Sequence, residues 1–382
     1  MLNNKIYKHF FIELSKHFFI VLFTFAAIVW TVQAVNFLDL IVEDGHAVSL
    51  YLNYSLLNIP KIITKFIPLS FLLSLVLVIL KFDNENELMI LWTSGLNKLN
   101  IINFFLKVSI IVTLMQLLLA SFVNPNVLNY SRSLIKSSSL DFISSIIKTN
   151  EFNDTIEGLT IYVEGKNESG VMKNIFIRDD SNVLSSIEND AESKSLTIYA
   201  EKGKIINGST NSLLLENGVI HTENRSQEIQ RVRFKRTELL LKNLKTKSIT
   251  YPKIQETPTE VLLDCFFKKK SIESQLKCES DKDLIDILSE INRRFGMPLY
   301  IPFLTLLCSF LLVSREESKV KGFYKYLYFG LAFIALLSAE ILVRYSGKSL
   351  PYTLIYYLLP ILFIPIVYLE LVRRFYYENL RK

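Results

Sequence analysis

Six segments of this sequence are long and apolar enough to cross a lipid bilayer, and this feature limits the fold more than any other. A membrane-spanning helix needs about 20 predominantly apolar residues. The segments are Phe18–Leu38, Ile62–Leu80, Ile101–Val123, Pro298–Val313, Tyr324–Val343 and Tyr352–Val372. The fourth is short and has two prolines near its start, and the first lacks the cleavage site that would follow a signal peptide. The sequence therefore predicts six transmembrane helices.

The apolar residues are concentrated at the two ends of the chain. Of its 382 residues, 50% are apolar and 21% are charged. This composition is too apolar for an ordinary soluble domain and too charged for a bare bundle of membrane spans. We therefore expect three domains, with three spans in 1–123, a soluble domain in 124–290 and three further spans in 291–382.

Basic residues predict the orientation, because cytoplasmic loops carry an excess of Lys and Arg. The basic residues that flank the spans are Lys5, Lys8, Lys16, Lys81, Lys98, Arg315, Lys319, Lys321, Lys325, Arg373, Arg374, Arg381 and Lys382. The first short loop, 39–58, has three acidic residues and no Lys or Arg. Both termini are thus predicted to be cytoplasmic and 124–290 to lie outside. The net charge of +6 is interpreted as this topology signal, so we expect no nucleic-acid partner.

The centre of the middle domain alternates between apolar and polar residues. In the stretch LTIYVEG, Leu159, Ile161 and Val163 face one way and the residues between them face the other. Similar stretches follow, and turn residues separate them. Short strands at this spacing predict a sandwich, a jelly roll or an open barrel. The flanks, Val127–Ile147 and Thr259–Ile291, are expected to be helical connectors.

The sequence contains no recognisable catalytic or metal-binding pattern. Its four histidines are scattered, and it has no Gly-x-Ser-x-Gly, no His-Glu-x-x-His and no phosphate-binding loop. We therefore expect no catalytic residue, no metal and no cofactor. Cys265 and Cys278 lie in the external region, where they can form a disulfide, but their spacing alone does not establish one. Cys308 lies in a span and is interpreted as a packing residue.

The stretch NENELMILWTSG, Asn84 to Gly95, predicts a short helix between the second and third spans. Asn84 is expected to be its N-cap with Glu87 completing a capping box, and Gly95 is expected to end it. At the helical period, Leu88, Met89 and Trp92 share one face, whereas Ile90 lies among polar residues.

These features resemble those of the LptF/LptG permease family of the lipopolysaccharide exporter. The resemblance is carried by three spans, an external β domain and three more spans, and by the stretches ENELMILWTSGLN, GLTIYVEGKNESGVMKNIFIRDD, TIYAEKGKII and EINRRFGMPLYIP. The stretch IVWTVQAVNFLDLIVEDG looks more like LptF than LptG. Asn86, where the family often has Ser, and the insertion around CFFKKKSIESQLKCES depart from the pattern.

The resemblance implies an α+β membrane protein of the bacterial inner membrane, with a periplasmic β-jellyroll between helices 3 and 4. It implies a permease subunit of an ABC transporter that extracts lipopolysaccharide and passes it to a periplasmic bridge. The implied partners are a homologous LptG-type permease, a cytoplasmic ATPase dimer, the single-span bridge protein LptC and the bridge protein LptA. The sequence has no nucleotide-binding signature, so another chain must supply the energy.

The resemblance also suggests two sets of site residues. The first would couple helix 84–95 to the ATPase and comprises Glu87, Leu88, Ile90, Leu91 and Trp92. The second would contact lipopolysaccharide and comprises Lys61, Lys65, Arg344, Val232 and Phe234. Simpler structural roles compete with these assignments. Glu87 is also explained as a capping residue, the two lysines by snorkelling, and Arg344 by an ion pair with Glu340 one turn away.

Phe234 and Val232 alternate along one predicted strand with Arg231, Arg233 and Lys235. We expect the two apolar residues to face inward, toward acyl chains, and the three basic residues to form a solvated face or a track for lipid. Two other functions remain open. One is a permease that drives a periplasmic partner mechanically without moving lipid, and the other is a membrane-anchored enzyme of the envelope.

Overall fold

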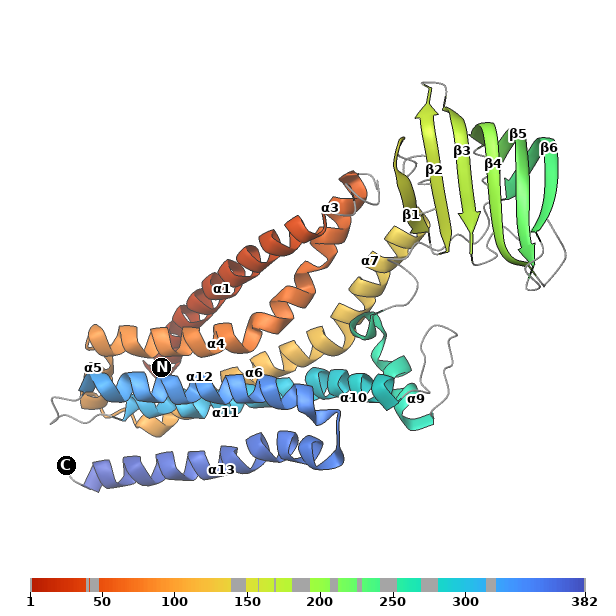
Figure 1. Cartoon of the computed structure of the whole chain (residues 1–382). Helices are drawn as coiled ribbons and strands as arrows, with labels where there is room; N and C mark the ends of the chain where they lie inside the picture. Colours follow the sequence, from red (N-terminus) through yellow and green to blue (C-terminus); the bar gives the residue numbers. More distant parts are fainter. Residues whose placement is uncertain are drawn as a thin grey trace. The chain divides into compact units, whose positions relative to one another are not determined.

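The structure of the chain is a computed structural model (Figure 1). It describes residues 2–38, 41, 48–138, 149–156, 158–167, 170–180, 193–206, 212–224, 229–240, 253–268, 281–313 and 321–380. The chain forms two compact units. The helical unit comprises Met1–Gln33, Leu57–Asn129 and Pro252–Lys382, and the β unit comprises Ala34–Leu56 and Tyr130–Tyr251.

The described helices fall on both sides of the sheet in the sequence. They are α1 (Leu2–Asn36), α3 (Val48–Leu57), α4 (Ile59–Asn84), α5 (Glu87–Thr93), α6 (Lys98–Leu118), α7 (Asn124–Ser138), α9 (Thr259–Lys268), α10 (Asp281–Gly296), α11 (Tyr300–Ser309), α12 (Lys321–Ser346) and α13 (Leu350–Leu380). Tighter or wider turns interrupt them, namely η1 (Leu119–Val123, π-helical) and the 3-10 turns η3 (Ile254–Glu256), η4 (Met297–Leu299) and η5 (Phe310–Leu312).

The prediction of six membrane spans is confirmed. Six stretches of the described residues are helical, long and apolar enough to cross a membrane: Lys5–Asn36, Val48–Asn84, Lys98–Ile135, Asp283–Leu312, Lys325–Ser346 and Leu350–Tyr377. The fourth is longer than the apolar run from which it was predicted, because the amphipathic helix α10 leads into α11 through η4. Pro298 stands in η4, where proline is tolerated at the start of a helical turn.

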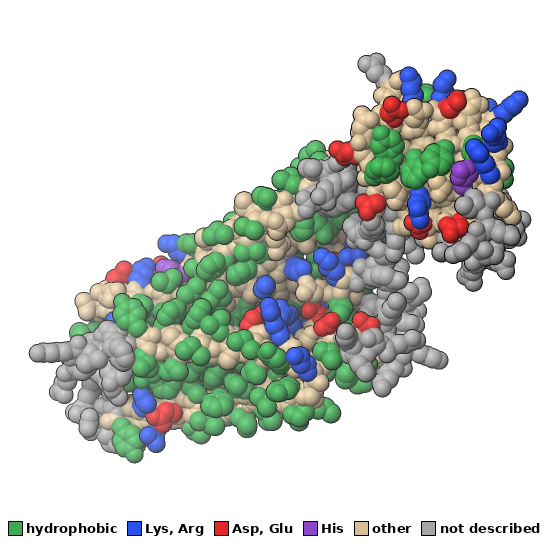
Figure 2. Space-filling model, in the orientation of Figure 1, with side chains coloured by type: hydrophobic (Ala, Val, Ile, Leu, Met, Phe, Trp, Pro, Cys, Tyr) green, Lys and Arg blue, Asp and Glu red, His purple; other side chains and the backbone are tan. Residues whose placement is uncertain are grey.

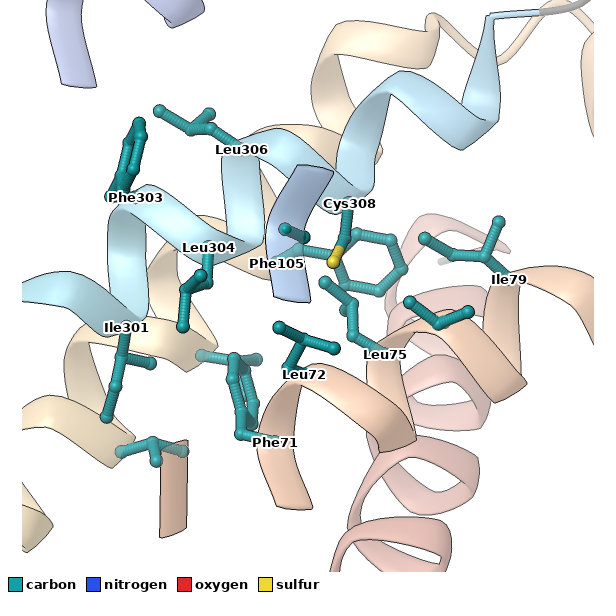
Figure 3. Packing of buried hydrophobic residues seen from close by; sticks show 14 of the residues in the cluster. Phe71, Leu72, Leu75, Ile79, Phe105, Ile301, Phe303, Leu304, Leu306 and Cys308 are labelled. Atoms are coloured by element: carbon teal, nitrogen blue, oxygen red, sulfur yellow. The ribbon is translucent and has the colours of Figure 1, made fainter. Parts of the chain in front are cut away.

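The main core of the helical unit is a cluster of apolar side chains from several helices, and a smaller cluster lies between α9 and α10. α11 lies within it, and its residues Ile301, Leu304 and Cys308 are at most 2% exposed. Figure 3 shows these side chains pointing toward Phe71, Leu72 and Leu75 of α4 and toward Phe105 of α6. Cys308 is free and fully buried, which agrees with a packing role. This packing holds the helices that carry the polar residues of the unit.

The β unit contains one antiparallel sheet in which each strand pairs with its neighbour in sequence (Figure 1). Its strands are β1 (Phe152–Ile156), β2 (Leu159–Lys166), β3 (Val171–Asp179), β4 (Ser193–Ile206), β5 (Ser212–Asn224) and β6 (Ile229–Leu240). The predicted α+β class, with a β domain between the third and fourth spans, is confirmed. The described strands follow a meander, however, because each pairs with its neighbours in sequence, and they do not have the Greek-key order of a jelly roll.

A polar row crosses this sheet from β2 to β6. It consists of the aligned residues Glu164, Asn174, Glu201, Asn217 and Lys235. Asn174 and Asn217 have positive φ angles of 47° and 53°, a conformation that Asn tolerates better than most residues. Asn174 donates a hydrogen bond to Glu164 at 2.5 Å, and Asn217 donates one to Glu201 at 3.3 Å. The buried positions change their alternation at this row, from Ile220 on one side to Leu215 on the other.

The helical connectors differ in part from the prediction. The first, α7, ends at Ser138, and residues 139–147 lie outside the described part of the chain. The second is two helices, α9 and α10, with residues 269–280 likewise outside it. Cys265 is buried on α9 and is disulfide-bonded. Because Cys278 lies outside the described residues, its pairing stays a prediction.

Candidate functional site

A polar cavity of ≈ 520 Å³ lies within the helical unit. Two of the predicted substrate residues, Lys61 and Lys65, line it from α4, where their i, i+4 spacing places them on one helix face. The other polar lining residues are Gln33, Thr64, Gln116, Asn124, Gln255, Glu290, Arg293, Arg294 and Glu340. Apolar side chains complete the wall, namely Val29, Ile62, Phe66, Ala120, Leu128 and Met297. The cavity thus combines a charged lining with an apolar wall.

The charges in this cavity are unbalanced toward the positive. Arg293 pairs with Glu340 of α12 at 3.2 Å, and Arg294 pairs with Glu290 at 3.2 Å. Lys61 and Lys65 form no ion pair with a carboxylate of the described residues. An anionic group entering the cavity would therefore find two ammonium groups that no carboxylate neutralises directly.

Arg294 is the most deeply buried of the described charged residues that line the cavity, and it is 2% exposed. Its guanidinium donates to the Thr259 hydroxyl at 2.9 Å and to Glu290 at 3.2 Å. It also donates to three backbone carbonyls in the segment that follows the β unit in the sequence. These are the carbonyls of Ile254, Gln255 and Thr257, at 3.4, 3.2 and 3.1 Å. The hydroxyl of Thr259 in turn donates to the Ser121 carbonyl in η1. Arg294 therefore ties the segment that returns from the β unit to the end of α6.

The expected ion pair between Glu340 and Arg344 does not form among the described residues. Glu340 pairs with Arg293 instead, because α10 packs beside α12 and brings the guanidinium within reach. Arg344 is exposed on α12 and is absent from the cavity lining. Sequence reasoning missed Gln116 and Asn124, which also line the cavity. The signal that could have found them is a polar side chain within or directly after the apolar run 101–123.

The short helix α5 forms, but its start was predicted wrongly. Asn84 is the last residue of α4, and the left-handed residue Asn86 precedes Glu87 without a side-chain cap. Glu87 therefore makes no capping box, and its carboxylate lies 3.4 Å from the Nε2 atom of His9 on α1. The predicted stop is confirmed, because Gly95 has a φ of +84° and the Leu96 amide bonds the Leu91 carbonyl.

The faces of α5 are partly as predicted. Leu88 is buried, and Trp92 is half-buried with the Lys98 ammonium 5.3 Å from its ring centroid. Ile90 is exposed as expected, but Met89 is also exposed, at 57%, and so does not pack on the helical unit. Residues of α1 and α5 line a shallow cavity of ≈ 340 Å³. They are Lys5, Ile6, His9, Phe10, Glu87, Ile90 and Leu91.

Phe234 and Val232 on β6 have different surroundings. Phe234 is half-buried against the core of the sheet, and its ring covers Gly218, where an added Cβ would lie 2.4 Å from the ring. Val232 is 48% exposed. Arg231, Arg233 and Lys235 are exposed, as the alternation predicted. The described residues contain no group of three His, Cys, Asp or Glu side chains that could hold a metal.

Comparison with known families decides the assignment of the chain. The statistical description of the family "Lipopolysaccharide export system permease LptF/LptG" matches residues 8–374, nearly the whole chain. The chain belongs to the LptF/LptG family. This family consists of transporter permeases and not of enzymes, and six apolar helices fit a multi-pass protein of the inner membrane.

The chain is also similar to an uncharacterized protein of Rickettsia prowazekii (strain Madrid E). The two are 27% identical over 199 residues, which cover 51% of this chain and 54% of that protein. The match thus spans about half the length of the curated relative.

Proposed function

We propose that this chain is a permease subunit, of the LptF type, in an ABC transporter that extracts lipopolysaccharide from the inner membrane. The proposal rests on the match of residues 8–374 to the LptF/LptG family. The substrate would leave the outer leaflet and pass to a periplasmic bridge. The partners would be an LptG-type permease, a cytoplasmic ATPase dimer, the single-span protein LptC and LptA.

Within that function, we assign the polar cavity to the phosphorylated end of the lipid. Its two lysines, which form no ion pair with a described carboxylate, are suited to phosphate, which an ammonium group binds as a point charge. The apolar wall is suited to the first carbons of the acyl chains. Arg344 would then act outside this cavity, and Phe234 is the better candidate of the two β6 residues for apolar contact.

We assign α5 to the coupling of the permease with the ATPase. The exposed side chains of Met89 and Ile90 support this assignment, because a cytoplasmic partner with an apolar groove would cover them. The distribution of basic residues supports cytoplasmic termini and a periplasmic β unit.

The assignment is tested by reconstituting the complex and measuring ATP-dependent release of lipopolysaccharide from proteoliposomes. Replacing both Lys61 and Lys65 with Glu should abolish release while the complex still assembles. Lys348→Glu is the matched control, because Lys348 is exposed and lies outside the cavity lining. Equal release by the double variant and the control would refute the assignment of the phosphate site to this cavity. The chain should also copurify with an ATPase and a second permease. Copurification with a hydrolase instead would favour a permease that drives a periplasmic partner mechanically without transporting lipid.

A further inference from the structure

One face of the β unit carries a row of aromatic side chains that its core does not use. The aligned residues of β1 to β4 are Phe152, Tyr162, Phe176 and Tyr199, one from each strand. Their ring centroids are 4.9 Å apart for the first pair and 5.1 Å apart for the last. His221 on β5 belongs to the neighbouring row on the same face, and its ring lies 5.9 Å from that of Tyr199.

Within the described part of the chain, two rings of the row are exposed. Phe152 is 68% exposed and Tyr199 is 48% exposed, whereas the other two rings and that of His221 are half-buried by their neighbours. The residues that alternate with them, such as Ile161, Ile177 and Ile198, form the buried core on the opposite face. Cross-strand contacts between the rings stabilise the sheet, but they leave Phe152 and Tyr199 exposed among the described residues.

Two arginines of β6, Arg231 and Arg233, lie at one end of this face. The register continues from Tyr199 to Val219 and then to Arg233, and His221 is paired with Arg231 in the adjacent row. Residues directly opposite each other in an antiparallel pair share a face, so both guanidinium groups stand on the aromatic side. Both are exposed, and neither forms an ion pair with a described residue. Figure 2 shows hydrophobic side chains across this face, with a histidine and basic side chains toward one edge.

Polar rows run along both sides of the aromatic row. One is the row of Glu and Asn side chains that ends at Lys235. The other contains Thr160, Arg178, Thr197, His221 and Arg231. A ligand lying on the rings would therefore meet hydrogen-bond donors and acceptors on either side, and two cations at one end. A membrane surface fits this pattern poorly, because insertion needs an apolar face that is broad and not bordered by amides and carboxylates.

We propose that this face, formed by Phe152, Tyr162, Phe176, Tyr199, Arg231 and Arg233, binds a phosphorylated sugar chain. Sugar rings present C–H groups that stack on aromatic side chains and hydroxyls that exchange hydrogen bonds with neighbouring polar groups. Arginine binds phosphate through paired N–H donors. Strands about 4.8 Å apart give four aligned rings a length of about 14 Å, which accommodates several sugar units. The proposal rests on the proposed function, since lipopolysaccharide carries such a chain.

The test measures binding to the full-length chain in detergent by calorimetry. The probe is the phosphorylated core oligosaccharide released from lipopolysaccharide by complete deacylation, so that acyl contacts play no part. Tyr199→Ala should weaken binding at least tenfold, because Tyr199 is exposed and its loss leaves the core intact. The double change Arg231→Gln with Arg233→Gln should weaken binding of the phosphorylated probe and leave a dephosphorylated probe unaffected. Lys202→Gln, three residues beyond Tyr199 on β4, is the matched control.

Unchanged affinity in Tyr199→Ala, or no binding of the probe to the wild-type chain, would overturn the proposal. Binding of vesicles with anionic headgroups that depends on Tyr199 would overturn it in favour of a lipid surface, and dependence of an acidic protein partner on Tyr199 would overturn it likewise. Release of intact lipopolysaccharide from proteoliposomes is measured in parallel. Release without oligosaccharide binding refutes this site alone, whereas failure of release in the wild-type complex refutes the proposed function.

Discussion

Arg294 offers the sharpest test of how the helical unit is held together. Replacing it with Gln removes a charge that is 2% exposed and that donates to two side chains and three backbone carbonyls. The carboxylate of Glu290, whose side chain is only 13% exposed, then loses its ion-pair partner. Breaking a buried pair in this way costs about 3–5 kcal/mol. With about 2.1 cal/mol/K of unfolding entropy per residue, that loss lowers the melting temperature of a 382-residue chain by about 4–6 °C.

The measurement is the melting temperature of the purified chain in detergent, followed by intrinsic fluorescence and by loss of the monodisperse peak. Arg293→Gln is the control, because Arg293 is adjacent in sequence but has a side chain that is 32% exposed and pairs only with Glu340 among the described ion pairs. Its loss should cost about 1 kcal/mol or less. Arg294→Lys keeps the charge and loses the forked geometry, so it should recover only part of the stability. Equal melting temperatures for Arg293→Gln and Arg294→Gln would refute the reasoning.

Two further predictions concern the β unit. Gly218→Ala places a Cβ 2.3 Å from the Tyr199 carbonyl oxygen and should destabilise the sheet, measured by circular dichroism, while Gly165→Ala meets nothing within 4 Å and should be neutral. A cysteine at exposed Glu216 should react with an impermeant thiol reagent once the outer membrane alone is permeable, and one at exposed Asn97 only after the inner membrane opens. The opposite labelling order would reverse the proposed topology.

The parts of the fold that sequence could predict are those that repeat along the chain. A bilayer demands a long apolar run from every span, so hydropathy finds the six spans, including a fourth whose proline-rich start lies in η4. A half-buried strand alternates with period two, so the pattern at Leu159, Ile161 and Val163 locates β2 and its buried face.

The parts that sequence could not predict depend on residues far apart. Arg294 binds Thr257 and Thr259, which are more than thirty positions away, and no local pattern announces those contacts. The aromatic row likewise exists only once the register of the strands is known. In the candidate site, the one-turn spacing of Lys61 and Lys65 was sufficient to bring them together. For Arg344 local spacing misled, because Glu340 found a partner on another helix.

The last prediction concerns Glu87, whose carboxylate the structure places beside the His9 imidazole and not at a helix cap. Glu87 begins α5, a helix of 7 residues, and its side chain is 37% exposed beside that of His9, which is 53% exposed. An exposed pair of this kind contributes about 1 kcal/mol or less to stability. A charge pair across an interface with the ATPase would be worth more, because truncating one partner costs about 2–5 kcal/mol. The two roles therefore predict different magnitudes.

Glu87→Gln removes the charge at nearly constant shape, and under the coupling assignment it should weaken association of the ATPase at least about tenfold, since 1.4 kcal/mol corresponds to a factor of ten. Association is measured by titrating the purified ATPase onto the permease pair in nanodiscs. His9→Gln removes the imidazole beside Glu87 and leaves the Glu87 charge in place, so association should stay within about twofold of wild type. Glu85→Gln, at an exposed position two residues earlier, controls for general loss of negative charge. If His9→Gln weakens association as much as Glu87→Gln does, Glu87 acts by holding α5 against α1, and the docking contact must be sought at Met89 and Ile90.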